Sequence, residues 1–504
     1  MLLIYPPVAK PCEPPAGIAH LAGVLRGNGL PCTLLDANLE GLLFLLATAD
    51  QPQDTWGRRA YRSLEANLAA LRSPALYTNP DRYQRAVADV NRMLELAGLK
   101  KNITLSLANY QDTALSPLES GDLLRAAEHP EENIFSAYFA KRLQELLAEE
   151  KPGLLGFSLN YLSQAITAFA MIGFIKQIAP ALQVVLGGGL VTSWLSNPAW
   201  ENPFGGLIDH LVPGPGEKAL ISLLDGHDDL QHHRPDFEGL PLKDYLAPGF
   251  ILPYAASSGC YWNKCSFCPE QAEKNPYTST STARVLHDID LLAQQTNPAL
   301  LHFLDNAVSP ALLRSLASNP PHIDWYGFAR IHPALADADY CNALRRSGCV
   351  MLKLGLESGN QDVLDSMHKG IDLTMVADVL TALQNAGIGT YVYLLFGTPS
   401  ESITEARHTL DFVVDHADAI TFLNLAIFNM PVCSQEVSTL EVSSFSGGNL
   451  SLYTDFVHPL GWDRQAIRRF LDREFKRHPA VADILRRDAP YFTSNHAPFF
   501  AGTV

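Results

Sequence analysis

The stretch Ser257–Glu270 reads SSGCYWNKCSFCPE and brings Cys260, Cys265 and Cys268 within nine residues of one another. Their spacing is C-x4-C-x2-C. The chain has eight cysteines in 504 residues, which is too sparse for a disulfide scaffold, and the other five are scattered. Clustering of this kind indicates metal binding, and three soft thiolates on one loop suit iron–sulfur ligation.

The number of ligands bears on which metal is bound. A structural zinc site normally has four protein ligands, and the next cysteine downstream is Cys341. Three thiolates on a 4Fe–4S cluster leave one iron open to chelate an amino and a carboxylate group, as S-adenosylmethionine requires. A zinc knuckle that borrows a distant histidine, or three incidental core cysteines, remain the alternatives.

Around this loop, residues 251–430 alternate apolar strand-like and helical segments. The expected strands are YAASSG, LLHFLDNA, IDWYGFAR, MLKLGLESG, TYVYLLFG and AITFLNLAIF, with helices such as ADYCNALRRSG between them. Six parallel strands with intervening helices predict a (β/α)6 partial TIM barrel whose active site lies at the carboxyl ends of the strands. The cysteine loop follows the first of them.

Residues 1–230 show a second alternation, which predicts a doubly wound, Rossmann-like α/β domain with a helical insertion at about 42–150. Its binding crevice should lie at the carboxyl ends of the strands. The small or polar residues expected there are Asp36, Ser158, Gly187, Gly188, Gly189, Gly214, Gly216 and Glu217. Taken alone, these glycines are equally compatible with tight turns.

The remaining segments have less definite patterns. Residues 231–250 are polar and proline-punctuated and predict a linker. Residues 431–504 predict a small α-rich C-terminal extension. Its polar residues that could face a substrate, or fill ordinary structural roles, are His458, Tyr491, Asn495 and His496.

Composition restricts the function. The formal net charge is −16, from 37 basic and 53 acidic residues, which argues against a nucleic-acid substrate. No apolar run approaches the ~18 residues of a membrane span. The start, MLLIYPPVAK, lacks the basic region of a signal peptide, so a cytoplasmic location is expected.

From about Tyr254 to Phe428 the chain resembles the radical S-adenosylmethionine (SAM) superfamily. The usual family spacing is C-x3-C-x2-C, so this chain has one extra residue in the loop. The family's other landmarks are matched, in order, by Leu304-Asp305-Asn306, Arg330, the GLESG motif at 355–359, the stretch Val363–Gly370, and Phe396-Gly397-Thr398-Pro399 with Glu401.

The resemblance implies a set of site residues and a reaction. Cys260, Cys265 and Cys268 would bind the 4Fe–4S cluster. Residues implied to contact SAM are Phe267, Asp305, Asn306, Arg330, Glu357, Ser358 and Gly397. The reduced cluster would break a carbon–sulfur bond of SAM, normally giving a 5′-deoxyadenosyl radical, and would need an external one-electron reductant of the flavodoxin or ferredoxin type.

Residues 1–230 resemble the cobalamin-binding domain that precedes many radical SAM cores. The positions implied to bind cobalamin are Ser158, Gly187, Gly188, Gly189, Gly214, Gly216 and Glu217. The D-x-H-x-x-G motif that supplies a cobalt ligand in some cobalamin proteins is absent, since Asp36 is followed by Ala37-Asn38-Leu39-Glu40-Gly41. No histidine is therefore available there to ligate cobalt.

The leading hypothesis is a cobalamin-dependent radical SAM methyltransferase that acts on an unactivated carbon of an unknown small molecule or peptide. The second is a cluster-only radical SAM enzyme, for hydrogen abstraction, rearrangement or cyclisation, with a non-binding N-terminal domain. The third is a non-catalytic iron–sulfur or zinc protein. A methylthiotransferase is disfavoured because the chain has no second cysteine triad and no basic RNA-binding tail.

Overall fold

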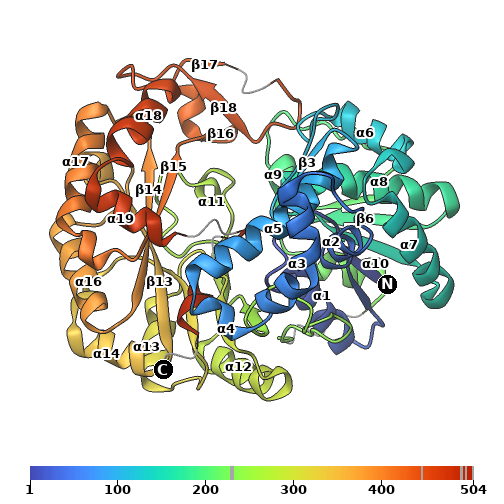
Figure 1. The fold of residues 1–504 in the computed structure, drawn as a ribbon, viewed down its shortest axis with the longest axis horizontal. Coiled ribbons are helices and arrows are strands. Elements are labelled where there is room, and N and C mark those ends of the chain that lie inside the picture. The colour runs from blue at the N-terminus through green and yellow to red at the C-terminus, as the bar shows by residue number, and fades with distance from the viewer. Residues whose placement is uncertain (227–231, 444–446, 489–491, 494–495, 502–504) are drawn as a thin grey trace. The chain divides into compact units, whose positions relative to one another are not determined.

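The computed structural model describes the whole chain except residues 227–231, 444–446, 489–491, 494–495 and 502–504 (Figure 1). The chain divides into two compact units. The first is Met1–Gly249 with two short pieces from the C-terminal part, and the second is the remainder from Phe250 onward. Each unit is built around one parallel sheet, so the predicted α/β class is confirmed.

The first unit contains a five-stranded parallel sheet in the order β2-β1-β5-β6-β7. The strands are β1 (Leu2–Tyr5), β2 (Thr33–Asp36), β5 (Leu154–Ser158), β6 (Gln183–Gly187) and β7 (His210–Val212). The chain adds β2 on one side of β1 and the later strands on the other. The strand order therefore reverses between β1 and β5, which is where doubly wound sheets bind ligands.

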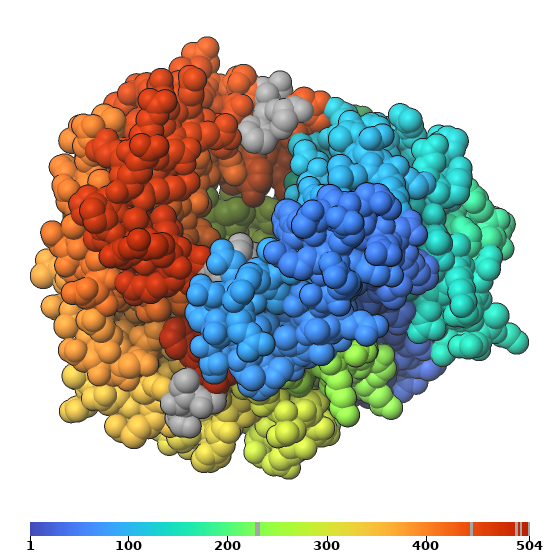
Figure 2. Space-filling model, in the orientation of Figure 1, coloured from blue at the N-terminus to red at the C-terminus, as the bar shows by residue number. Residues whose placement is uncertain are grey.

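The helical insertion occupies the crossover from β2 to β5. Its helices are α2 (Ala37–Ala47), α3 (Thr55–Leu71), α4 (Pro74–Tyr77), α5 (Pro80–Leu99), α6 (Ser120–Glu128) and α7 (Ser136–Glu150). Helix α2 begins directly after β2 because the Asp36 side chain accepts a hydrogen bond from the Leu39 N–H and caps it. A hairpin of β3 (Ile103–Leu105) and β4 (Tyr110–Asp112) interrupts the helices and was not expected. Helices α3 and α5 form the blue surface in Figure 2.

Four more helices cover this sheet: α1 (Ala16–Gly27), α8 (Leu162–Ile178), α9 (Gly189–Leu195) and α10 (Glu217–Leu223). Helix α8 is apolar around most of its circumference because it packs against α6 and α7 and is buried along nearly its full length. Helix α8 is therefore a core helix of the first unit. In the described residues, no helix has the length and apolar character needed to cross a membrane.

The segment between the two sheets packs on the first unit. The Asp236 N–H donates to the Ala19 carbonyl at 2.9 Å, and its carboxylate pairs with Arg26 at 2.8 Å. The Tyr245 hydroxyl donates to the buried Asp36 carboxylate at 2.7 Å. The segment predicted as a linker is thus tied to α1 and β2 by specific contacts.

The second unit contains a six-stranded parallel sheet in the order β15-β14-β13-β12-β11-β8. The strands are β8 (Ile251–Tyr254), β11 (Leu300–Phe303), β12 (Trp325–Ala329), β13 (Cys349–Glu357), β14 (Gly389–Phe396) and β15 (Phe422–Ile427). The connecting helices include α12 (Thr282–Thr296), α13 (Pro310–Ser318), α14 (Ala338–Arg346), α16 (Leu373–Asn385) and α17 (Ile403–Asp415) (Figure 1). Neighbouring strands follow chain order, as a partial (β/α)6 barrel requires.

The C-terminal part is less helical than predicted. It contains α18 (Arg464–Phe470), which continues into a π-helical turn at Leu471–Phe475, and α19 (Pro479–Arg487). It also contains a small antiparallel sheet of β16 (Met430–Pro431), β18 (Tyr453–Phe456) and β17 (Val442–Ser443). These strands are two to four residues long, too short for the period-two pattern that would have revealed them in the sequence.

Candidate active site

The three cysteines lie on the loop between β9 (Ser257–Ser258) and α11 (Pro269–Ala272). Strand β9 pairs antiparallel with β10 (Thr278–Ser279), so a short hairpin frames the loop. The loop follows β8, the first strand of the six-stranded sheet, at its carboxyl end. The predicted position of the loop is therefore correct, although β8 ends at Tyr254 and a separate strand intervenes.

Asp305 and Asn306, at the end of β11, hold the chain that leads into the cysteine loop. The Asp305 carboxylate is buried and accepts hydrogen bonds from the Ala256 N–H at 3.0 Å and from the Ser257 hydroxyl. Burial raises the pKa of Asp305, and these hydrogen bonds oppose the rise. The Asn306 side-chain amide donates to the Gly259 carbonyl at 3.2 Å. Both residues thus position the first cysteine, and contact with SAM remains a prediction for them.

The extra residue of the C-x4-C spacing is accommodated by a local left-handed turn. Asn263 has φ of 45°, a conformation that asparagine tolerates better than most residues. The neighbouring Trp262 turns its ring toward the 368–370 segment and donates from its indole nitrogen to the His368 carbonyl at 3.1 Å. Farther along the loop, the Ser266 N–H donates to the Met367 carbonyl at 3.0 Å. The longer loop is thus secured to the segment after α15 (Gln361–Ser366).

The three thiols are half-buried. Burial raises the pKa of Cys265, and it raises the pKa of Cys268 to about 11. The cations of Lys369 and Arg330 face Cys265 and favour its thiolate. In the described part of the chain, no three Cys, His, Asp or Glu side chains are placed to hold a single metal ion. Thiolates of a four-iron cluster bind different iron atoms and need not converge on one point. Three half-buried thiols on one loop, with two cations facing Cys265, therefore fit an anionic iron–sulfur cluster.

Glu357 and Lys369 form a buried ion pair beside the loop. Glu357 is the last residue of β13, has φ of 71°, and lies 2.8 Å from the Lys369 ammonium. That ammonium is also 5.5 Å from the ring centre of Phe267. The carboxylate predicted to hold SAM therefore already has a cationic partner that the sequence pattern did not reveal.

Ser358 points toward α17. Its buried hydroxyl lies 3.2 Å from the Thr409 hydroxyl and accepts a hydrogen bond from the Asn360 N–H at 3.1 Å. Its predicted role in binding SAM has no support from these contacts. The serine of the GLESG motif here joins strand β13 to a helix.

Gly397, after β14, has φ of 85°, and a Cβ atom there would lie 2.4 Å from Ile467. Its N–H donates to the buried Glu401 carboxylate, which also accepts from the Trp462 indole at 3.0 Å. Burial raises the pKa of Glu401 to about 7. A cavity of about 90 Å³ lies next to this turn, lined by Ser266, Phe267, Ser366, Met367, Thr398, Pro399, Ser400, Phe428 and Glu436.

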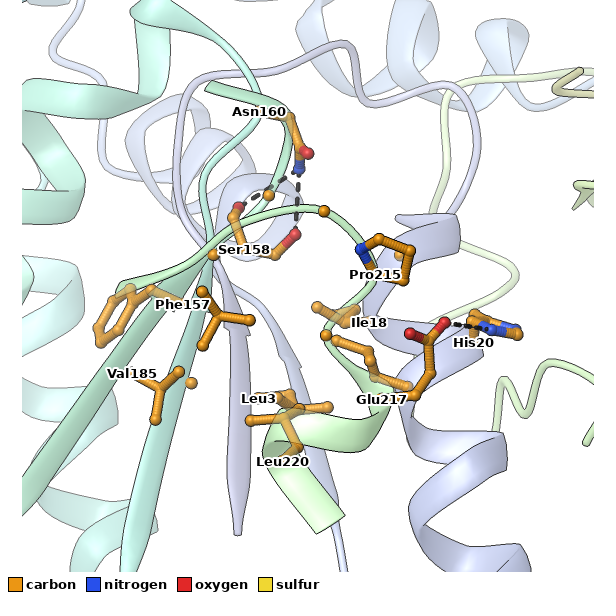
Figure 3. A pocket seen from close by; sticks show the side chains of 18 residues that line it. Leu3, Ile18, His20, Phe157, Ser158, Asn160, Val185, Pro215, Glu217 and Leu220 are labelled. Carbon is orange, nitrogen blue, oxygen red and sulfur yellow. Dashed lines mark hydrogen bonds and ion pairs between the residues drawn. The ribbon is translucent and has the colours of Figure 1, made fainter. Parts of the chain in front are cut away.

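The first unit has a cavity of about 200 Å³ at the carboxyl end of its sheet (Figure 3). The lining includes Leu3 of β1 and Phe157 of β5, the two strands between which the order reverses. Six of the seven residues predicted to bind cobalamin line it: Ser158, Gly187, Gly188, Gly214, Gly216 and Glu217. Gly189 does not; its N–H donates to the Asn160 side chain at 3.0 Å.

His20 is one of the polar residues of this cavity that the sequence interpretation missed. Its Nε2 lies 2.9 Å from the Glu217 carboxylate (Figure 3). Burial is the largest influence and acts to raise the pKa of Glu217, but the hydrogen bond and charge of His20, together with a backbone hydrogen bond, hold that pKa below its usual value. Gly17, His20 and Leu21 line the cavity at i, i+3 and i+4 of α1, so the helical period could have revealed this histidine.

Both histidines proposed for a substrate pocket have partners within the protein. His458 lies 2.9 Å from the Thr398 carbonyl, and buried His496 pairs with Asp488 at 3.0 Å. These contacts favour the structural role for both. Tyr491 and Asn495 lie outside the described residues.

Residues 254–413 match the family model described as the radical SAM superfamily, so this part of the chain is a radical SAM domain. The chain is 23% identical over 310 residues to an uncharacterized methyltransferase, PH0819, of Pyrococcus horikoshii, over 54% of this chain and 66% of that protein. It thus spans slightly under two thirds of this relative. It is 21% identical to an anaerobic magnesium-protoporphyrin IX monomethyl ester cyclase of Rubrivivax gelatinosus, over 69% and 71% of the two chains.

Among solved structures, the fold is similar to TsrM, a radical SAM methyltransferase from Kitasatospora setae. The structure of TsrM with tryptophan and a SAM analogue gives a TM-score of 0.57 at 15% identity, over 97% of this chain and 89% of TsrM. A TsrM structure with cobalamin and a [4Fe-4S] cluster bound gives 0.54 at 16% identity, over 97% and 91%. The likeness extends over both units and confirms the predicted two-part α/β fold.

Proposed function

We propose that this protein is a cobalamin-dependent radical SAM methyltransferase that methylates an unactivated carbon. The observation that carries the proposal is the presence in one chain of two different sites. One is a three-cysteine loop with adjacent cations, and the other is a cavity at the reversal point of a doubly wound sheet. Each matches one cofactor of this chemistry.

In the second unit, Cys260, Cys265 and Cys268 would bind the 4Fe–4S cluster and leave one iron for SAM. A bound cluster would supply the electron that cleaves a carbon–sulfur bond of SAM. Asp305 and Asn306 hold the loop, while Phe267 and the turn at Gly397 border the cavity that would take part of SAM. Glu357 would meet the methionine ammonium if the Lys369 side chain gives way.

In the first unit, the cavity would take one appended group of cobalamin, since about 200 Å³ is too small for the corrin ring. A ligand could closely approach the backbone at four glycines, because these residues have no side chains. They are Gly187, Gly188, Gly214 and Gly216. The pair His20 and Glu217 would offer a hydrogen-bonding edge at the cavity wall.

Similarity to the methyltransferase PH0819 supports methyl transfer, as does similarity to TsrM, whose structure contains cobalamin and a [4Fe-4S] cluster. The substrate would be a small molecule or peptide, and an external flavodoxin- or ferredoxin-type protein would supply electrons. A cytoplasmic location would suit this oxygen-sensitive chemistry.

A labelled methyl group tests this function without a known substrate. The holoenzyme, prepared anaerobically with cobalamin, is reduced and mixed with SAM that carries a trideuterated methyl group. Mass spectrometry should detect trideuteromethylcobalamin bound to the protein. Retained corrinoid without label transfer would contradict methyl transfer. A protein that retains no corrinoid but forms 5′-deoxyadenosine would instead be the cluster-only enzyme.

A further inference from the structure

Arg330 is a cation at the cysteine loop whose charge has no carboxylate partner among the residues that the structure describes. It follows β12, and its guanidinium donates to the carbonyls of Lys369 and Gly370, the latter at 2.9 Å. Within the described residues it forms no ion pair with Asp or Glu. Burial lowers the pKa of Arg330, and the thiols of Cys265 and Cys260 are among the groups that oppose this. The groups that act on its charge are therefore those of the cysteine loop.

The loop itself holds this guanidinium in place. The guanidinium carbon lies 3.8 Å from the ring centre of Trp262, a stacking distance that suits the planar arginine head group. Trp262 lies inside the longer C-x4-C segment and is fixed by its hydrogen bond to the His368 carbonyl. Gly370 leaves room for the ring, because a Cβ atom there would lie 2.4 Å from Trp262. The extra loop residue and the position of Arg330 are thus parts of one arrangement.

Two other cations near the loop, Lys369 and Lys264, differ from Arg330 in their charge partners and in their exposure to solvent. The Lys369 ammonium is neutralised by Glu357 at 2.8 Å. The Lys264 ammonium lies 4.8 Å from the ring centre of the same Trp262, but Lys264 is exposed, so water and salt screen its charge. Of the three cations, Arg330 is partly buried and, in the described part of the chain, has no carboxylate partner.

We propose that Arg330, held by the ring of Trp262, raises the reduction potential of the iron–sulfur cluster bound by Cys260, Cys265 and Cys268. Reduction adds one negative charge to the cluster, and a nearby buried cation stabilises the reduced form more than the oxidised form. Arg330 is a positioning and tuning residue in this account, and the electron comes from the external one-electron donor. The inference rests on the proposed function, because it requires a bound cluster.

The test is a redox titration of the full-length, anaerobically reconstituted protein, followed by electron paramagnetic resonance of the reduced cluster. Arg330→Gln should lower the midpoint potential, with the ratio of reduced to oxidised cluster falling about tenfold at a fixed applied potential, or ~59 mV for one electron. Arg330→Lys should lower the midpoint potential by a smaller amount, because lysine keeps the positive charge. Trp262→Ala should shift in the same direction as Arg330→Gln, by a smaller amount.

Lys264→Gln is the matched control, because it removes an exposed cation from the same ring. Lys264→Gln should change the midpoint potential by less than a third of the change that Arg330→Gln causes. An unchanged midpoint in Arg330→Gln, with or without reduced iron content, would show a merely structural role and overturn the inference. Equal shifts in Arg330→Gln and Lys264→Gln would overturn it as well. Absence of any cluster signal in the unmutated protein would instead refute the proposed function.

Discussion

The two parallel sheets prepare their binding sites in opposite ways. In the first unit, the strand order reverses at β1 and β5, and the cavity there is bordered mainly by glycines and apolar side chains, with His20 and Glu217 as its hydrogen-bonded pair. In the second unit, the strands follow chain order, and the site consists of thiols, an ion pair and a stacked arginine on loops after the strands.

The difference shows what each site can recognise. A cavity bordered by glycines selects a ligand by shape, so an added side chain that fills the cavity should abolish binding. A loop of thiols and cations selects by bonding and charge, so its function is lost when one donor atom is removed. Cobalamin binding in the first unit and cluster binding in the second unit should therefore be lost separately, through different substitutions.

Loss of one thiol should have the largest effect. Cys265→Ala is expected to lower the iron content from about four per chain to less than about one, because a 4Fe–4S cluster needs its cysteine ligands. Corrinoid binding should remain. Iron analysis and the optical spectrum of anaerobically purified protein measure both, with the scattered Cys433→Ala as the control. Loss of corrinoid together with iron would contradict the separation of the two sites.

The buried Glu401 should make stability depend on pH. Burial raises its pKa from 4.5 to about 7, so the folded state holds a proton that the unfolded state has released. The associated stability is complete below about pH 4.5 and is lost as pH rises toward 7, by at most about 3 kcal/mol at 1.36 kcal/mol per pH unit. Glu401→Gln should remove this slope in denaturant titrations between pH 4.5 and 7.5.

The exposed Glu441→Gln serves as the control for Glu401 and should retain the slope. Parallel pH profiles of the Glu401→Gln variant and the unmutated protein would refute the assignment.

Filling the cavity of the first unit should weaken cobalamin binding. Gly216 lies outside the left-handed region, with φ of −87°, and an added Cβ would make only ordinary contacts of 3.7 to 4.0 Å. Gly216→Val should reduce affinity for cobalamin at least tenfold, or about 1.4 kcal/mol, in equilibrium titrations that follow the corrinoid spectrum. Gly205→Val is the control, because open space surrounds that position. Equal affinity in the two variants would place the ligand elsewhere.

Ser358→Ala should have the smallest effect on the site. Because its hydroxyl contacts Thr409 of α17, the substitution should cost about 1 kcal/mol of stability and change SAM affinity less than twofold. Calorimetric titration with SAM and thermal unfolding separate the two effects. A large loss of SAM affinity at unchanged stability would restore the role that the GLESG motif implied.

The sequence supported different depths of prediction in the two units. Six strands and the location of the cysteine loop were predicted, because strand periodicity and thiol spacing are local signals. The ion pair of Glu357 with Lys369 was not predicted, and neither was the hydrogen bond from the Ala256 N–H to Asp305. Both contacts depend on packing between different segments of the chain. The glycines of the first unit indicated space, but only the structure distinguishes Gly188, which lines the cavity, from Gly189, which does not.

Local patterns also failed where elements were short. The β3–β4 hairpin and the small C-terminal sheet have strands of two to four residues, below the length at which alternation can be recognised. Trp262 carried no signal by itself, since its role depends on Arg330, 68 positions later.

Metal analysis of the full chain, purified anaerobically with cobalamin supplied, shows directly whether one protein holds both cofactors. We expect about four iron atoms and about one cobalt atom per chain, with absorption from both an iron–sulfur cluster and a corrinoid. About one zinc atom per chain with neither iron nor cobalt would contradict it.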